Sequence, residues 1–250
     1  MNIYITKEEH EFLLKHRNRS AEYRGKNQEM VVGSHLYGTN TEDSDKDVIY
    51  FYNSDIFYSM STCHLPKKEQ FIYDDKENNQ QILWMTEYQF WKNLASGDST
   101  INSDYVLFSG NLPEYQALNM CCTQKVIKAY LGFAKRDLKQ WNRYNKLFHA
   151  IRGLYIAESL LMRKLPSKEI IKDHHRRYLR KTLKGELESL KNFYLNIYDQ
   201  LKKDFIDQVN NGDLKLYFVP YISDQEHDPY LSLARKLYNA NNKIEWKYDN

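Results

Sequence analysis

Cysteine is scarce in this chain of 250 residues: the three that it has are Cys63, Cys121 and Cys122. They form no even set, so a disulfide framework is not expected. Cys121 and Cys122 are adjacent and therefore lack the spacing of a zinc knuckle. The pair Cys63 and His64 has no second pair nearby in sequence, which leaves a metal site there as the weaker alternative. We interpret the cysteines as reduced and mostly structural.

Long apolar runs are also missing, because none approaches the roughly 20 residues that span a bilayer. The first residues, 1–9, lack the basic-then-apolar layout of a signal peptide. A hydrophobic content of 42% with 28% charged residues is ordinary for a globular protein. We therefore expect a cytoplasmic protein with no membrane partner, long enough to build a core in one large or two small domains.

A large excess of one charge sign is absent too, because the formal net charge is only +3. A charge this small does not by itself indicate nucleic-acid binding. The distribution of charge is more informative. Like charges four residues apart destabilise a helix by about 0.2–0.5 kcal/mol per pair, so a basic stripe suggests an anionic partner such as RNA or a triphosphate. A solvated face that acids from elsewhere partly neutralise is an equal alternative. The stripe, in a segment of helical pattern, consists of Lys172, Arg176, Arg180 and Lys184.

The densest chemistry of the chain lies in residues 33–47, between two runs of strand type at 29–32 and 48–52. Gly33 has no Cβ, so the backbone can approach a phosphate closely, and Ser34 offers a hydroxyl and an N–H as donors. Asp45 and Asp47 are two apart, so in a strand they share a face, where a divalent cation relieves their repulsion. The pattern indicates a site for a nucleoside triphosphate with magnesium.

Two other interpretations of these acids are possible. A calcium-binding EF-hand loop that starts at Asp43 requires glycine at its sixth position and glutamate at its twelfth, where this chain has Val48 and Ser54. A solvated turn of Asp, Ser and Thr residues between strands is the other alternative. The EF-hand pattern fails at both positions, and the solvated turn leaves the Gly-Ser corner unexplained.

The order Gly33-Ser34, ten residues, and then Asp45-Lys46-Asp47 with apolar Val48 resembles the signature of the nucleotidyltransferase (polymerase-beta-like) superfamily. The longer pattern, with Tyr37-Gly38, Thr41 and Asp43-Ser44, is similar to the predicted nucleotidyltransferase branch associated with RNA repair. Residues 146–154, with the sequence KLFHAIRGL, resemble the helical segment that follows the catalytic domain in that branch. The resemblance covers residues from about 30 to about 165.

This resemblance implies a nucleotidyltransferase that uses Mg²⁺ (or Mn²⁺) to move a nucleoside monophosphate from a triphosphate, with ATP favoured, to a hydroxyl acceptor. The favoured acceptor is an RNA end. Asp45 and Asp47 would be the catalytic residues and metal ligands. For His149, helix packing and a catalytic role both stay open. The residues implied in nucleotide binding are Gly33, Ser34, Ser44, Lys146 and Arg152.

The family places a third carboxylate on a neighbouring strand, and here its position falls on Gln80 or on the next residue, Gln81. An amide oxygen coordinates weakly and cannot accept a proton in this role. Two alternatives to the RNA-modifying enzyme follow: a nucleotide- or RNA-binding pseudoenzyme of the same fold, or a nucleotidyltransferase that modifies a protein hydroxyl. The acids that could substitute for the missing carboxylate are Asp74, Asp75, Glu77 and Glu87.

The expected fold class is α+β. Residues 1–115 would form a nucleotidyltransferase domain with a small mixed sheet and flanking helices, and residues 116–250 a helical domain that forms the other wall of the cleft. A capping box at Thr6–Glu9 predicts a first helix that runs to about Lys26. Further strands are expected at 71–73 and 80–85, a helix at 86–95, helices over most of 114–210, a strand-like run at 214–219 and a final helix at 229–239.

Overall fold

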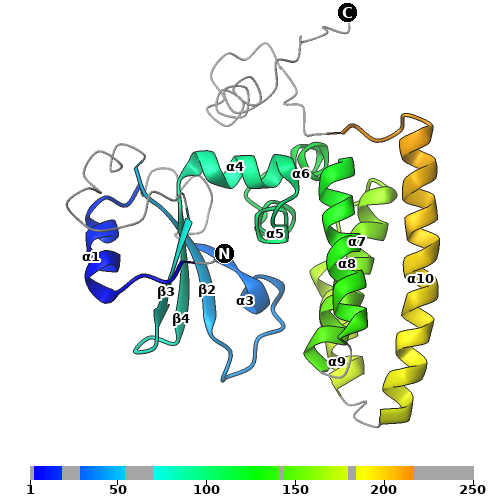
Figure 1. The fold of residues 1–250 in the computed structure, drawn as a ribbon, viewed down its shortest axis with the longest axis horizontal. Coiled ribbons are helices and arrows are strands. Elements are labelled where there is room, and N and C mark those ends of the chain that lie inside the picture. The colour runs from blue at the N-terminus through cyan, green and yellow to red at the C-terminus, as the bar shows by residue number, and fades with distance from the viewer. Residues whose placement is uncertain (1–2, 19–28, 54–69, 141–143, 180–183, 217–250) are drawn as a thin grey trace, which may run out of the picture.

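The structure is a computed structural model that describes residues 3–18, 29–53, 70–140, 144–179 and 184–216. Helices and strands follow one another in a mixed order in the first half of this chain, and helices alone make up the second half (Figure 1). The elements are α1 (Lys7–Lys15), β1 (Met30–Val32), α3 (Gly33–Tyr37), β2 (Lys46–Phe51), β3 (Gln70–Asp75), β4 (Gln80–Met85), α4 (Glu87–Ser96), α5 (Thr100–Phe108), α6 (Glu114–Cys121), α7 (Gln124–Lys139), α8 (Tyr144–Leu161), α9 (Lys168–Leu179) and α10 (Lys184–Asn210).

The four strands form one sheet in the order β1-β2-β4-β3. β1 runs antiparallel to β2, β2 runs parallel to β4, and β4 runs antiparallel to β3. The outer edge of β3 is extended by a parallel bridge between Tyr4 and Ile72. The predicted α+β class with a small mixed sheet is therefore confirmed.

The two faces of the sheet pack against different helices. Val48 and Tyr50 of β2 belong to a small buried cluster that includes Leu13 of α1. Ile49 and Phe51 belong to the large cluster that the helices after β4 complete. Because alternate residues of a strand share a face, Asp47 lies on the face of Ile49 and Phe51, which is turned toward the helices. Figure 1 shows α1 and the later helices on opposite sides of the sheet.

The helices of the second half form a layer in which α7 packs along α8, and α10 covers both. α4 and α5 lie between this layer and the sheet (Figure 1). One hydrophobic cluster runs from Met30 in β1 to Leu214 beyond α10 and thus crosses residue 115. The division into two domains at that residue stays a prediction. Within the described residues, no helix has both the length and the apolar character needed to cross a membrane.

The predicted capping box is confirmed, but the first helix is shorter than predicted. Thr6 Oγ1 accepts a hydrogen bond from the Glu9 N–H, and Glu9 Oε2 accepts one from the Thr6 N–H. The helix ends at Lys15 rather than at about Lys26. The chain turns away there because Arg17 forms an antiparallel bridge with Tyr52, which adds a residue pair at the end of β2.

Local signals placed the other elements well, with three differences. The helix predicted at 86–95 is confirmed as α4, which Thr86 caps and Gly97 ends in the left-handed conformation. Helix α5 was not predicted, and the helical run after 114 has an unpredicted break at Thr123, which caps α7. Of the strand-like run 214–219, the described residues form an isolated bridge between Thr123 and Lys215. Residues 217–219 and the final helix predicted at 229–239 lie outside the described residues.

Candidate functional site

Gly33 of the Gly-Ser corner lies against Asp47, one of the two acids. β1 ends at Val32, which pairs with Asp47 of β2, and Gly33 then begins the short helix α3. Gly33 has a φ of 65°, and a Cβ at this position would clash with Oδ2 of Asp47. Glycine is therefore required both by the backbone conformation and by the neighbouring carboxylate. The two ends of the sequence motif therefore lie together in the fold.

The two acids differ in environment. Asp45 is exposed just before β2, whereas Asp47 is half-buried where β2 begins to pair with β1. Burial and then the neighbouring Asp45 raise the pKa of Asp47 to about 6, with His35 acting in the opposite direction. A bound cation would remove this penalty by stabilising the ionised carboxylate. In the part of the chain that is described, no third His, Cys, Asp or Glu joins the pair in a metal-binding group.

The residue opposite Asp47 on the neighbouring strand is an amide. In the parallel register of β2 and β4, Asp47 lies opposite Gln81, while Gln80 lies opposite Lys46. Residues in register share a face, so Gln81, rather than Gln80, is the neighbour of Asp47 on the side turned toward the helices. Asp74 follows Gln81 in the same row, but it lies two strands from Asp47, about 10 Å away by the spacing of strands.

The other substitute acids have different positions. Asp75 lies opposite Gln80 and accepts hydrogen bonds from Asn78 in the β3–β4 turn. Glu77, in the same turn, contacts Lys7 at 3.4 Å. Glu87 begins α4 after the far end of β4. Among the described residues, none of the acids proposed as substitutes lies beside Asp47.

The loop that joins α3 to β2 is held by its own polar groups. The hydroxyl of Ser44 accepts a hydrogen bond from the Thr41 N–H at 2.9 Å and lies 3.0 Å from the Thr41 hydroxyl. The carbonyl of Ser44 contacts His35 Nε2 at 3.4 Å. Ser44 thus shapes the loop, and its contact with a nucleotide stays a prediction.

Arg152 lies among buried groups that belong to four helices. Its guanidinium carbon is 4.4 Å from the centre of the Tyr37 ring, and Tyr37 is fully buried. Asp104, also buried, attracts Arg152 and accepts a 2.6 Å hydrogen bond from the Tyr130 hydroxyl. Burial itself lowers the pKa of Arg152, but these partners outweigh it and raise the pKa overall. Arg152 therefore connects α8 with α3, and Tyr37 fills the corner between them.

Lys146 and His149 face a second buried acid, Asp137 of α7. Lys146 Nζ and His149 Nδ1 each lie 3.8 Å from an Asp137 carboxylate oxygen, and Arg136 Nε lies at 2.9 Å. The His149 side chain is 43% exposed, yet burial of the rest of the ring and then Arg152 lower its pKa to about 4. His149 is thus neutral at physiological pH. Sequence reasoning missed Asp137 and Asp104, although each acid interrupts an apolar helical pattern, which is a usable signal.

The basic stripe is partly neutralised by acids on its own helix. Lys172 contacts Glu169 at 3.0 Å, and exposed Arg176 contacts Asp173 at 3.8 Å. Lys172 also packs against the α3 corner, because a Cβ added to Gly38 would lie 2.6 Å from its Cε. Arg180 and the side chain of Lys184 lie outside the described residues. An RNA-binding role for the stripe stays a prediction.

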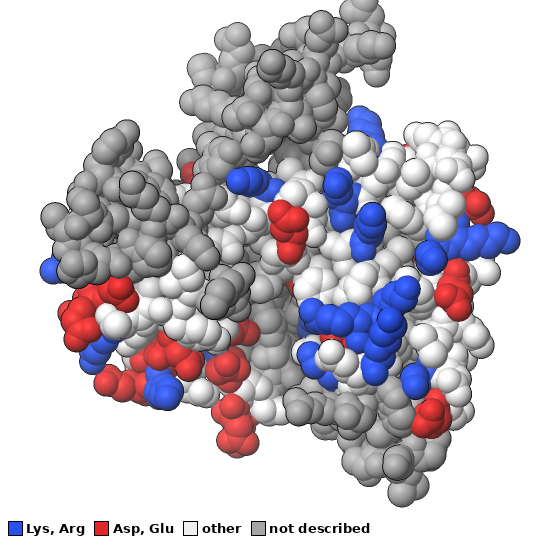
Figure 2. All heavy atoms as spheres, in the orientation of Figure 1, with Lys and Arg blue, Asp and Glu red and all other residues white. Residues whose placement is uncertain are grey.

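Side chains of one charge sign gather in two places on the face that Figure 2 draws. Figure 2 shows acidic side chains gathered over the lower end of the sheet and a group of basic side chains over the lower part of the α7–α8 layer. Arg136 and Lys146 both contact the buried carboxylate of Asp137.

No family model matches the chain, and neither a curated protein nor a solved structure matches it.

Proposed function

We propose that the chain is a magnesium-dependent nucleotidyltransferase that moves a nucleoside monophosphate from a triphosphate, with ATP favoured, to a hydroxyl acceptor, with an RNA end favoured. The observation that supports this most is the contact between Gly33 and Asp47. Gly33 is suited to approach a phosphate and Asp47 to bind a metal. They stand at opposite ends of the motif in sequence but lie together where β1 pairs with β2. A solvated turn would not require such a contact.

The donor set fits a magnesium ion. Asp45 and Asp47 would hold it, and such a cation would offset the burial and the repulsion from Asp45 that raise the pKa of Asp47. When bound, the metal would neutralise negative charge on the triphosphate as pyrophosphate departs. Gly33 and Ser34 would orient the phosphates through backbone N–H groups and the Ser34 hydroxyl. Asp47 would then accept no proton, because metal binding requires its ionised form.

The amide at Gln81 favours a second candidate function. A neutral side chain opposite Asp47 cannot take the proton of an attacking hydroxyl. A protein that binds nucleotide or RNA through the same residues without turnover is therefore the alternative. The two functions differ in a single measurable product, pyrophosphate.

The test is incubation of the protein with labelled ATP, CTP, GTP or UTP, Mg²⁺, and total RNA or total protein. We expect label in RNA together with release of pyrophosphate, and neither with the variant Asp45→Ala/Asp47→Ala. Affinity for nucleotide without pyrophosphate would replace the enzyme by the binding protein. Label in protein, identified by mass spectrometry, would change the acceptor. A chain that neither binds nor transfers any nucleotide would overturn the proposal.

A further inference from the structure

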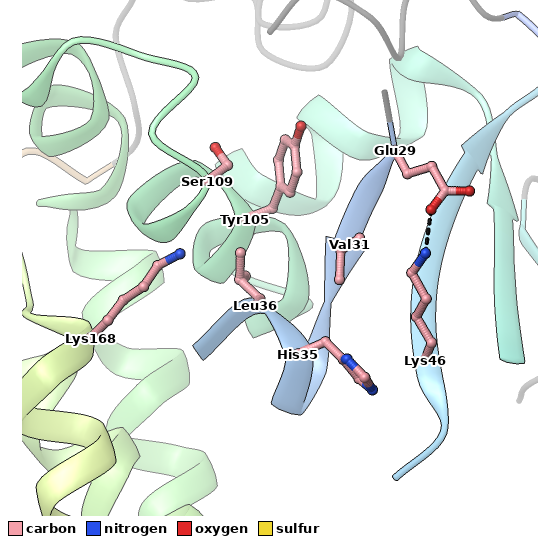
Figure 3. A pocket seen from close by; sticks show the side chains of 8 residues that line it. All are labelled: Glu29, Val31, His35, Leu36, Lys46, Tyr105, Ser109 and Lys168. Atoms are coloured by element: carbon pink, nitrogen blue, oxygen red, sulfur yellow. Dashed lines mark hydrogen bonds and ion pairs between the residues drawn. The ribbon is translucent and has the colours of Figure 1, made fainter. Parts of the chain in front are cut away.

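A cavity of about 300 Å³ lies at the edge of the sheet and is lined by residues of β1, β2, α3, α5 and α9 and by two residues next to these elements. Figure 3 shows Lys168 at one end of it and the ion pair of Lys46 and Glu29 at the other. Neither Asp45 nor Asp47 lines the cavity. The lining residues are Glu29, Val31, His35, Leu36, Lys46, Tyr105, Ser109 and Lys168.

The charge of Lys168 lies in an unfavourable place within this cavity. It opens α9, where the positive end of the helix dipole disfavours a cation. Burial and then Lys172 lower its pKa. The nearby acid Glu169 contacts Lys172 instead, and Lys168 makes no ion pair with a described residue. An ammonium group in so unfavourable a position is stabilised if an anion binds in front of it.

The rest of the cavity suits a flat, partly polar body. Val31 and Leu36 supply apolar wall, and the ring of Tyr105 stands beside them (Figure 3). The hydroxyl of Tyr105 accepts a 2.6 Å hydrogen bond from Asn111 Nδ2, which holds the ring in place. At the far end, the carboxylate of Glu29 is held by Lys46 and by the Tyr50 hydroxyl at 3.4 Å, and it can accept from an amino or hydroxyl group of a ligand.

We propose that this cavity binds a single nucleotide, with its phosphate at Lys168 and its base between Leu36 and Tyr105. The volume is at the lower end of the range for ligand sites in proteins, about 300–1,000 Å³, which suits one nucleotide. The nucleotide is either the terminal residue of an RNA or a free monophosphate. This inference rests on the proposed function and names a second site beside it.

His35 and Lys46 connect this cavity with the acid pair. Both line the cavity, while His35 also acts on the carboxylate of Asp47 and Lys46 lies between the two acids in the chain. Lys46 points to the face of the sheet opposite to Asp47, because neighbouring residues of a strand alternate. A nucleotide in the cavity would therefore be separated from the metal ligands Asp45 and Asp47 by the edge of β1. This position suits an acceptor or an effector rather than the triphosphate.

The test is calorimetric titration of the whole protein, without magnesium, with AMP, CMP, GMP and UMP and with a six-nucleotide RNA. We expect saturable binding that Lys168→Gln weakens at least tenfold. The matched control is Lys164→Gln, which removes the same charge at an exposed residue four positions earlier, outside the cavity, and should bind as the wild type does. Urea unfolding of both variants checks that neither has lost its fold.

Two comparisons then locate the ligand and its source. Asp45→Asn/Asp47→Asn should keep the magnesium-free affinity for monophosphates, so failure of nucleotide transfer and failure of this site are distinguishable. Tighter binding of the RNA identifies an RNA terminus, and tighter binding of a monophosphate identifies the free nucleotide. No binding of either kind, or equal binding by wild type and Lys168→Gln, would overturn the inference.

Discussion

The guanidinium of Arg152 lies 4.4 Å from the centre of the Tyr37 ring, so a helix of the second half of the chain rests on the corner that follows the Gly-Ser pair. A cation over an aromatic face is favourable, and more so when both are shielded from water. The nearby carboxylate of Asp104 adds to the attraction. This contact ties the position of α3, and with it Gly33 and Ser34, to the packing of α8.

Replacing Arg152 by methionine should therefore destabilise the protein. The change leaves Asp104 buried without its cation, which costs about 2–4 kcal/mol in the free energy of unfolding. Urea unfolding at pH 7.5 measures it. Tyr37→Phe is the matched control and should change stability by less than about 1 kcal/mol, because the buried Tyr37 hydroxyl has no hydrogen bond of standard geometry. Adding Asp104→Asn to Arg152→Met should recover part of the loss. Equal effects of the two single variants would contradict this account.

Gly33→Ala should cost more than the same change at Gly212. Both glycines have positive φ values, 65° and 77°, so each substitution costs about 1–2 kcal/mol for the left-handed backbone. Nothing lies within 4 Å of a Cβ at Gly212, whereas a Cβ at Gly33 meets the Asp47 carboxylate. Overpacking adds about 1–3 kcal/mol at Gly33 alone. Thermal unfolding compares the two variants, and equal losses would show that Asp47 moves aside freely.

Asp47→Asn should stabilise the metal-free protein at pH 7.5. The pKa of Asp47 is about 6 in the folded protein, against an ordinary value of 3.8, so the folded state binds more protons than the unfolded chain between these pH values. The stability that protonated Asp47 contributes to the fold is lost as the pH rises through about 6. The variant should be more stable by about 1 kcal/mol at pH 7.5, allowing for partial exposure, and equal to wild type near pH 3.5. Magnesium should raise the melting temperature of the wild type alone. If the variant were less stable than the wild type at pH 7.5, the ionised carboxylate of Asp47 would not be a cost to the folded state.

Gln81→Asp should strengthen magnesium binding, whereas Gln80→Asp should not. The first change places a carboxylate opposite Asp47, and the second places one opposite Lys46 on the other face of the sheet. We expect about a tenfold gain in magnesium affinity from the first, since a third charged oxygen ligand joins two others. Calorimetric titration with magnesium in the presence of a non-hydrolysable triphosphate measures this. Equal gains from both variants would mean that general negative charge, rather than position, controls binding.

His10 should make stability depend on pH below 6.5, the ordinary pKa of a histidine. Burial lowers the pKa of His10, and the Trp84 indole N–H donates a 3.0 Å hydrogen bond to its Nδ1, which must be unprotonated. The unfolded state therefore binds more protons, and stability falls as the pH drops below 6.5. His10→Gln keeps an acceptor for Trp84 without titrating in this range. Urea unfolding between pH 7.5 and 5 should give a smaller slope for the variant, reduced rather than removed because the pKa of His149 is lowered too. An unchanged slope would exclude His10 as a contributor.

The sequence by itself determined those features whose causes are local. Thr6 and Glu9 form a capping box within one turn, Thr86 and Gly97 begin and end a helix, and the apolar runs beside residues 33–47 form strands. The motif of residues 33–47 also predicted that Gly33 and Asp47 lie close together. Each of these features depends on neighbours in the chain.

Tertiary structure decided what depends on distant partners. Whether Gln80 or Gln81 lies opposite Asp47 follows from the parallel register of two non-consecutive strands, where a slip of one residue exchanges the faces. The first helix ends early because Arg17 pairs with Tyr52, thirty-five positions later. The surroundings of Arg152 and the cavity at Lys168 arise only where α3, α5, α8 and α9 meet. The cost of burying a charge is set by groups brought near by folding, and these cannot be read from spacing along the chain.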